Sequence, residues 1–171
     1  GGTAAAVTWQ PYSDARLQQA AQDGKPTIID VYADWCIPCV ELDHATFRHP
    51  EVVTQLSQFA TLRVDATLEV PREAESLLER YDVYGAPTVL IFDAQGREHP
   101  ELRVLGYIPA EEMLKRLAKE YYFLGKWYTT EFGTLTSLAP DVDAFQLGQS
   151  QHFLHWLQNL ADETGYTGDE N

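Results

Sequence analysis

Both cysteines of the chain lie in one short stretch, which reads Ala33-Asp34-Trp35-Cys36-Ile37-Pro38-Cys39. Two cysteines separated by two residues can close a disulfide without unfolding the chain around them. The run just before them, Pro26-Thr-Ile-Ile-Asp-Val-Tyr-Ala33, is short, apolar and rich in β-branched residues, which is typical of a buried strand. A helix that begins near Cys36 places backbone N–H groups and the positive end of its dipole at that sulfur. The stretch therefore predicts a redox-active pair where a strand passes into a helix.

A metal site and a pair of structural thiols are the alternatives to redox chemistry. Zinc in proteins is held by about four ligands, and the sequence has no second cysteine pair. The nearest other soft ligand is His44, and the spacing of the histidines indicates no cluster with it. We therefore expect no metal and no cofactor other than the redox-active disulfide itself.

The pattern of apolar residues and helix-breaking residues predicts alternating strands and helices around this stretch. Helices are expected over 13–23, from about 36 to 50, and over 50–59, 71–81 and 109–119. Strands are expected over 26–33, 61–65, 89–92 and 102–106. A helix followed by the order βαβαββα predicts an α/β protein with a central mixed sheet flanked by helices, covering residues 8–120.

The predicted attacking thiol is Cys36, exposed at the helix start beside Trp35. Cys39, one turn further in, is the expected resolving thiol. Pro87, which stands between a glycine-containing turn and an apolar strand, suggests a cis peptide bond after Ala86. A proline that simply leads into a strand is the alternative.

Two acids are candidates for tuning the thiols. Asp30 lies in the middle of the apolar strand, where a carboxylate is costly to bury; either it points to solvent or it is a buried acid that raises the thiol pKa values and exchanges a proton with Cys39. Asp43 follows Cys36 by seven residues, on the same face of the predicted helix, and is either a second tuning charge or an ordinary exposed acid.

Composition limits the function classes. The chain carries 26 acidic and 12 basic residues, a net charge of −14, which argues against nucleic acid or an anionic membrane surface as partner.

Residues 121–171 hold 10 of the 20 aromatic residues and are predicted to form a partly helical extension, packed on residues 8–120 or used for docking, with a last helix starting near Ser150. The first six residues lack the features of a signal peptide, which leaves open a targeting signal or membrane part ahead of them.

These motifs resemble the thioredoxin superfamily and, within it, the C-terminal periplasmic domains of the DsbD family of thiol:disulfide interchange proteins. The similar stretches include Asp30-Val-Tyr-Ala-Asp-Trp-Cys36, Gly85-Ala-Pro-Thr88, Phe92-Asp-Ala-Gln-Gly-Arg-Glu-His-Pro100 and Arg103-Val-Leu-Gly106. The family has an acid at the positions of Asp30 and Asp43, the second usually being glutamate, and usually a lysine where Val40 stands. The resemblance implies a thioredoxin fold in which Trp35, Ile37, Pro38, Ala86 and Pro87 contact the substrate.

The leading hypothesis is a reductase that relays electrons through Cys36 and Cys39. The resemblance implies that the electron donor is a membrane-embedded redox domain and that the acceptors are periplasmic thioredoxin-like or isomerase proteins. It also implies a periplasmic location, either as a separate protein or as a domain of an inner-membrane protein. A monomer is expected. The alternatives are a stand-alone isomerase or oxidase, a partner-binding module with incidental cysteines, and a copper or zinc carrier.

Overall fold

The computed structural model describes residues 6–123, 127, 128, 137 and 138, and the chain divides into two units, residues 1–110 and 111–171. The first unit holds a five-stranded mixed sheet in the order β1-β3-β2-β4-β5. The three neighbours β1, β3 and β2 run parallel, and β4 and β5 are antiparallel to their neighbours. The strands are β1 (Gln10–Pro11), β2 (Thr27–Tyr32), β3 (Ala60–Asp65), β4 (Thr88–Phe92) and β5 (Val104–Leu105). This arrangement confirms the predicted fold class.

The helices begin and end where local chemistry favours it. The Ser13 hydroxyl accepts a hydrogen bond from the Arg16 N–H at 3.0 Å and caps α1, and Gly24 follows that helix with a φ of +67°. Proline occupies the first turn of α2 and of α3, where its missing N–H costs nothing. The helices of the first unit are α1 (Asp14–Gln22), α2 (Ile37–Glu41), η1 (Leu42–Thr46), α3 (Pro50–Leu56), α4 (Arg72–Arg80) and the short η2 (Pro100–Leu102).

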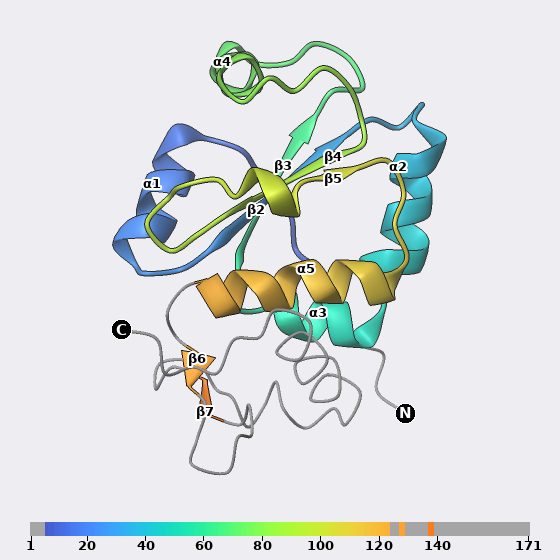
Figure 1. Ribbon diagram of the computed structural model, residues 1–171. Helices are drawn as coiled ribbons and strands as arrows, with labels where there is room; N and C mark the ends of the chain where they lie inside the picture. Colours follow the sequence, from blue (N-terminus) through green and yellow to red (C-terminus); the bar gives the residue numbers. More distant parts are fainter. Residues whose placement is uncertain (1–5, 124–126, 129–136, 139–171) are drawn as a thin grey trace. The chain divides into compact units, whose positions relative to one another are not determined.

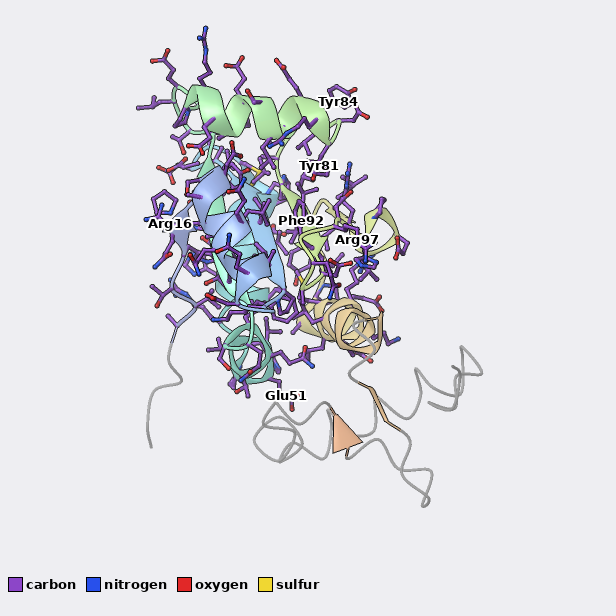
Figure 2. All side chains as sticks on the ribbon, turned by 90° about the vertical axis from the view of Figure 1, so that its left-hand side faces the viewer. Arg16, Glu51, Tyr81, Tyr84, Phe92 and Arg97 are labelled. Atoms are coloured by element: carbon purple, nitrogen blue, oxygen red, sulfur yellow. A yellow bond between two sulfur atoms is a disulfide. The ribbon has the colours of Figure 1, made fainter. Side chains whose placement is uncertain are left out.

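The two faces of the sheet are covered by different helices, so both sides of β2 are buried (Figure 1). Ile29 and Val31 share one core cluster with Leu77 of α4, and Leu17 of α1 packs against that cluster. In the same cluster Phe92 meets the ring of Tyr81 edge-on, with centroids 5.2 Å apart (Figure 2). The opposite face carries α2, η1 and α3, and side chains of β2 at even positions point to it.

The helix after Cys36 differs from the regular α-helix that the sequence predicts. It changes at Leu42 into the π-helical turn η1, in which the Phe47 N–H donates to the Leu42 carbonyl at 2.8 Å. The Thr46 hydroxyl donates to the Ile108 carbonyl at 2.6 Å and ties η1 to the chain after β5. The π turn widens the helix at Asp43, so the position of that acid cannot be obtained from α-helical spacing.

The helix α5 (Ala110–Phe123) lies in the second unit except for its first residue, and its Met113, Leu114 and Leu117 are buried as the spacing predicts. Two further strands, β6 (Trp127–Tyr128) and β7 (Ser137–Leu138), pair antiparallel. The helix predicted from Ser150 lies outside the described residues, and the predicted domain boundary at residue 120 stays a prediction. Within the described part of the chain, no helix combines the length and the apolar character needed to cross a bilayer.

Candidate active site

The two cysteines form a disulfide at the start of α2. Their Cα atoms are 5.2 Å apart, and Cys36 is the N-cap residue of the helix. The Cys39 N–H points at the Cys36 sulfur, with a nitrogen–sulfur distance of 3.3 Å. A backbone donor in this position stabilises a negative charge on the sulfur after reduction, because a hydrogen bond to the charged form favours that form.

The prediction that Cys36 is exposed is wrong. Its exposed fraction is 5 %, close to the 2 % of Cys39. The disulfide ties its sulfur to the buried Cys39, and both cysteines form a cluster with Ala33 against which Tyr32 and Ala86 pack.

The loop before β4 lies against this cluster, since Ala86 contacts it. The Ala86–Pro87 peptide bond is cis, as predicted. The Gly106 N–H donates to the Pro87 carbonyl at 3.1 Å, and the Thr88 hydroxyl donates to the Gly85 carbonyl at 2.7 Å, so the loop is held on both sides. The structure thus brings the predicted substrate residue Ala86 to the cysteine cluster, with Pro87 next to it in the chain.

Large apolar side chains that flank the cysteines in the sequence, or begin the loop to Pro87, are exposed. Trp35 is 67 % exposed and Ile37 is 72 % exposed, and Pro38 between the cysteines is exposed too. Tyr84, which begins the loop to Pro87, is 90 % exposed and is labelled in Figure 2. Exposed apolar side chains of this size next to a reactive group favour contact with another macromolecule. Their roles as substrate contacts stay predictions.

The two predicted acids are brought together by a residue that the sequence analysis does not select. Asp30 and Arg63 are register partners on the neighbouring strands β2 and β3. The Arg63 Nη2 lies 2.8 Å from Asp30 Oδ2 and 2.6 Å from Asp43 Oδ1, and its Nε donates to Asp30 Oδ2 at 3.0 Å. One guanidinium therefore bridges a carboxylate of β2 and a carboxylate of η1; we call these three side chains the acid clamp.

Burial governs the charge state of Asp30. Its side chain is 2 % exposed, and desolvation raises the pKa of the carboxyl to about 6, with Arg63 opposing the rise and Asp43 adding to it. This placement contradicts the alternative in which strand alternation turns Asp30 to solvent, because helices cover both faces of the sheet. Arg63 could have been noticed as a lone cation inside a strand, the same signal that identifies Asp30.

The described residues contain no group of three or more histidine, cysteine or acidic side chains that could hold a metal ion. His44, the nearest candidate to complete a copper or zinc site, is exposed on η1. The absence of a cofactor other than the disulfide stays a proposal.

The sequence and the structure of this chain are similar to the same group of known proteins. The sequence model of the thioredoxin-like family matches residues 8–94. The thiol:disulfide interchange protein DsbD of Tatumella citrea is 39 % identical over 107 residues, which cover 63 % of this chain and 18 % of that protein. DsbD of Escherichia coli (strain K12) is 42 % identical over 88 residues, covering 52 % of this chain and 15 % of the relative. The matched part thus spans less than a fifth of the length of either curated relative.

Among solved structures, the reduced C-terminal domain of DsbD from Neisseria meningitidis superimposes with a TM-score of 0.55 at 28 % sequence identity. The superposition covers 62 % of this chain and 91 % of that domain. The similarity therefore includes nearly the whole of a single domain of the larger relative.

Proposed function

Because this chain belongs to the thioredoxin-like family and is a thiol–disulfide oxidoreductase, we propose that it works as a reductase that relays electrons from a membrane-embedded redox donor to disulfides of periplasmic proteins. The observation that carries the proposal is the Cys36–Cys39 disulfide with the cis-proline loop against it, in a chain that matches nearly all of a DsbD C-terminal domain. The periplasmic location and the two kinds of partner belong to this proposal.

The exchange moves two electrons and conserves atoms at each step. The Cys36 thiolate attacks one sulfur of the partner disulfide, which breaks the partner S–S bond, forms a mixed disulfide and releases the partner's second sulfur as a thiolate. Cys39, deprotonated, then attacks the Cys36 sulfur, forms the Cys36–Cys39 bond and releases the partner's first sulfur. The two thiol protons end on the partner, which leaves reduced while this chain is oxidised.

The acids supply the proton chemistry in this proposal. Cys39 must lose a proton before it attacks, and a carboxylate with a pKa of about 6, as in Asp30, can accept a proton and return it near neutral pH. Negative charge on Asp30 and Asp43 also disfavours the thiolate of Cys36 and restrains its reactivity until a partner binds.

The reduction potential of the Cys36–Cys39 pair tests the direction of electron flow. We expect a value near or below about −220 mV, toward the thioredoxin end of the scale. The measurement is the tryptophan fluorescence of the full chain equilibrated in glutathione or dithiothreitol redox buffers, since one of its four indoles, Trp35, is next to the pair in sequence. A value near about −120 mV, where strong oxidants lie, contradicts the reductase and indicates an oxidase.

A further inference from the structure

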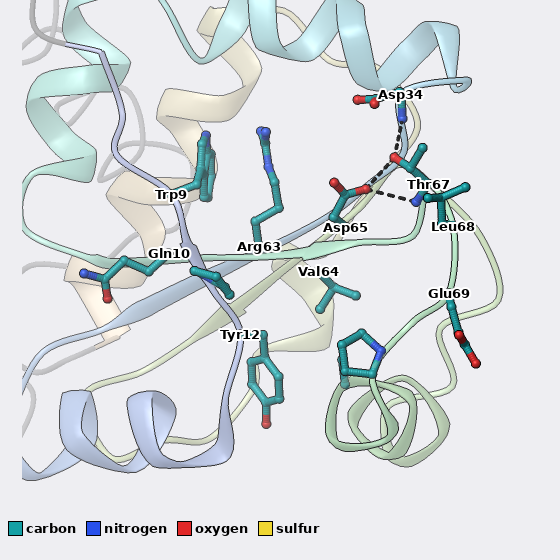
Figure 3. Close-up of a pocket in the computed structure, with 13 residues that line it drawn as sticks. Trp9, Gln10, Tyr12, Asp34, Arg63, Val64, Asp65, Thr67, Leu68 and Glu69 are labelled. Atoms are coloured by element: carbon teal, nitrogen blue, oxygen red, sulfur yellow. Dashed lines mark hydrogen bonds between the residues drawn. The ribbon is translucent and has the colours of Figure 1, made fainter.

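The Arg63 guanidinium is held between two aromatic rings as well as by the two carboxylates. Its guanidinium carbon lies 4.3 Å from the ring centroid of Tyr32 and 4.8 Å from that of Trp9. Figure 3 shows the Arg63 side chain extended beside Trp9. Trp9 in turn meets Phe47 edge-on, with centroids 5.0 Å apart, so the ring that contacts the cation is itself held in place. The guanidinium therefore has little freedom to leave the two carboxylates.

The acid clamp has one cation for two anions. With both carboxylates ionised its net charge is −1, and with Asp30 protonated it is zero. A proton that binds Asp30 thus neutralises the net charge of the clamp, and Arg63 and Asp43 keep their own charges. The clamp reaches the cysteines through Tyr32, because this ring contacts the Arg63 guanidinium and also packs against the cluster of Ala33, Cys36 and Cys39.

We propose that Arg63 is a positioning residue for thiol–disulfide exchange: its guanidinium joins Asp30 and Asp43 into one unit that binds or releases a single proton beside the disulfide. This inference rests on the proposed function and adds to it the residue that governs when Asp30 accepts a proton. Arg63 itself stays charged throughout, since its guanidinium does not deprotonate in proteins.

Solvent reaches this unit although Asp30 is buried. Arg63 is 18 % exposed and Asp43 is 24 % exposed. Arg63 also lines a groove with a cavity volume of about 620 Å³, whose other lining residues include Trp9, Tyr12 and Asp34 (Figure 3). Arg63 therefore links the buried Asp30 carboxyl to a groove that is open to solvent, and Asp43, which shares the Arg63 Nη2, is itself partly exposed.

The planar shape of the guanidinium lets it contact both carboxylates and two rings at once. Arg63 presents Nε and Nη2 to Asp30 and shares Nη2 with Asp43, while its flat face lies within reach of two aromatic rings. A lysine has a single nitrogen and no planar face, so it can keep the charge and lose this geometry. Arg63→Lys therefore separates the effect of charge from the effect of position.

The test is the titration of the Asp30 carboxyl carbon by nuclear magnetic resonance in the oxidised full chain. The parent protein is expected to show a midpoint at about pH 6. Arg63→Met removes the cation and is expected to raise the midpoint by at least about one pH unit. Asp43→Asn removes the neighbouring negative charge and leaves the guanidinium to Asp30, so it is expected to lower the midpoint. Arg63→Lys is expected to fall between the parent and Arg63→Met.

Arg80 supplies a matched control, because it too contacts a carboxylate and an aromatic ring. Its Nη2 lies 3.3 Å from Asp14 Oδ1, and its guanidinium carbon lies 5.9 Å from the Tyr81 ring centroid. Unlike Arg63, its side chain is well exposed. Arg80→Met is expected to leave the Asp30 midpoint unchanged. Unchanged midpoints in Arg63→Met and Asp43→Asn, or shifts in the same direction, overturn the proposal. If Arg63→Met does not fold, the Asp30 midpoints of Asp43→Asn and Arg63→Lys still test the proposal. If the Asp30 midpoint rises in Arg63→Met and falls in Asp43→Asn, but the reduction potential of the cysteine pair is that of a strong oxidant, only the reductase function is contradicted.

Discussion

Cys36→Ser is expected to lower the rate of protein disulfide reduction by about three orders of magnitude or more, because removal of the attacking group leaves no nucleophile for the first step. A serine hydroxyl remains protonated at neutral pH and is a poor nucleophile for sulfur. The measurement is the rate at which the reduced full chain reduces the disulfides of insulin. Far-ultraviolet circular dichroism of the variant checks that the fold is kept.

Cys39→Ser is the matched control for this experiment, because it also removes the disulfide but keeps the attacking thiol. It is expected to react once with a disulfide-containing peptide and to stop as a mixed disulfide, seen as an added mass in non-reducing mass spectrometry. If Cys36→Ser accumulates the mixed disulfide and Cys39→Ser does not, the assigned roles are reversed. A variant that lacks both cysteines and keeps the full activity of the protein favours a binding module in which the cysteines are incidental.

Asp30→Asn is expected to stabilise the oxidised protein at pH 8, and to do so less as the pH falls. The native Asp30 carboxyl has a pKa of about 6, against 3.8 for an ordinary aspartate, so between these values the native state binds more protons than the unfolded state. Stability therefore falls with rising pH across this window. The difference of about two pKa units corresponds to about 3 kcal/mol, a cost that the variant avoids because an amide stays neutral.

Urea unfolding of parent and variant at pH 4, 6 and 8 measures this effect as the change in the difference between their free energies of unfolding. That difference is expected to grow by about 2 kcal/mol from pH 4 to pH 8, mainly between pH 4 and 6.5. Glu79→Gln, at an exposed position of α4, serves as control and is expected to stay within about 0.5 kcal/mol of the parent throughout. A difference for Asp30→Asn that does not vary with pH contradicts a raised pKa at Asp30.

The same variant tests the link between the acid and the thiols. Removing a negative charge near Cys36 is expected to lower the pKa of its thiol in the reduced protein. The rate of alkylation by iodoacetamide as a function of pH reports that pKa. An unchanged thiol pKa in Asp30→Asn contradicts the proposed role of the acid, even if the stability result is as expected.

Several features of the site follow from short stretches of sequence. The apolar run before Cys36 is β2, the two cysteines are close enough to form a disulfide, and the bond before Pro87 is cis. The burial of Asp30 also follows locally, because its neighbours in the strand are all apolar and leave no polar side. Each of these depends on residues within a few positions of one another, where propensity and spacing act directly.

Other features depend on which segments meet in space. β1 has only two residues and is a strand because it pairs with β3. Cys36 is buried in a cluster against which Ala86 packs, and Ala86 lies far along the chain from the cysteines.

The redox pair, the fold class and the candidate acid in β2 could be predicted from the amino-acid sequence alone, since local propensity and residue chemistry suffice for these. The tertiary structure was needed to place Arg63 opposite Asp30, because the register of β2 against β3 is set by packing over the whole sheet. It was also needed to show that Asp43 shares this cation, because the π turn at Leu42 alters the helical spacing that the sequence predicts.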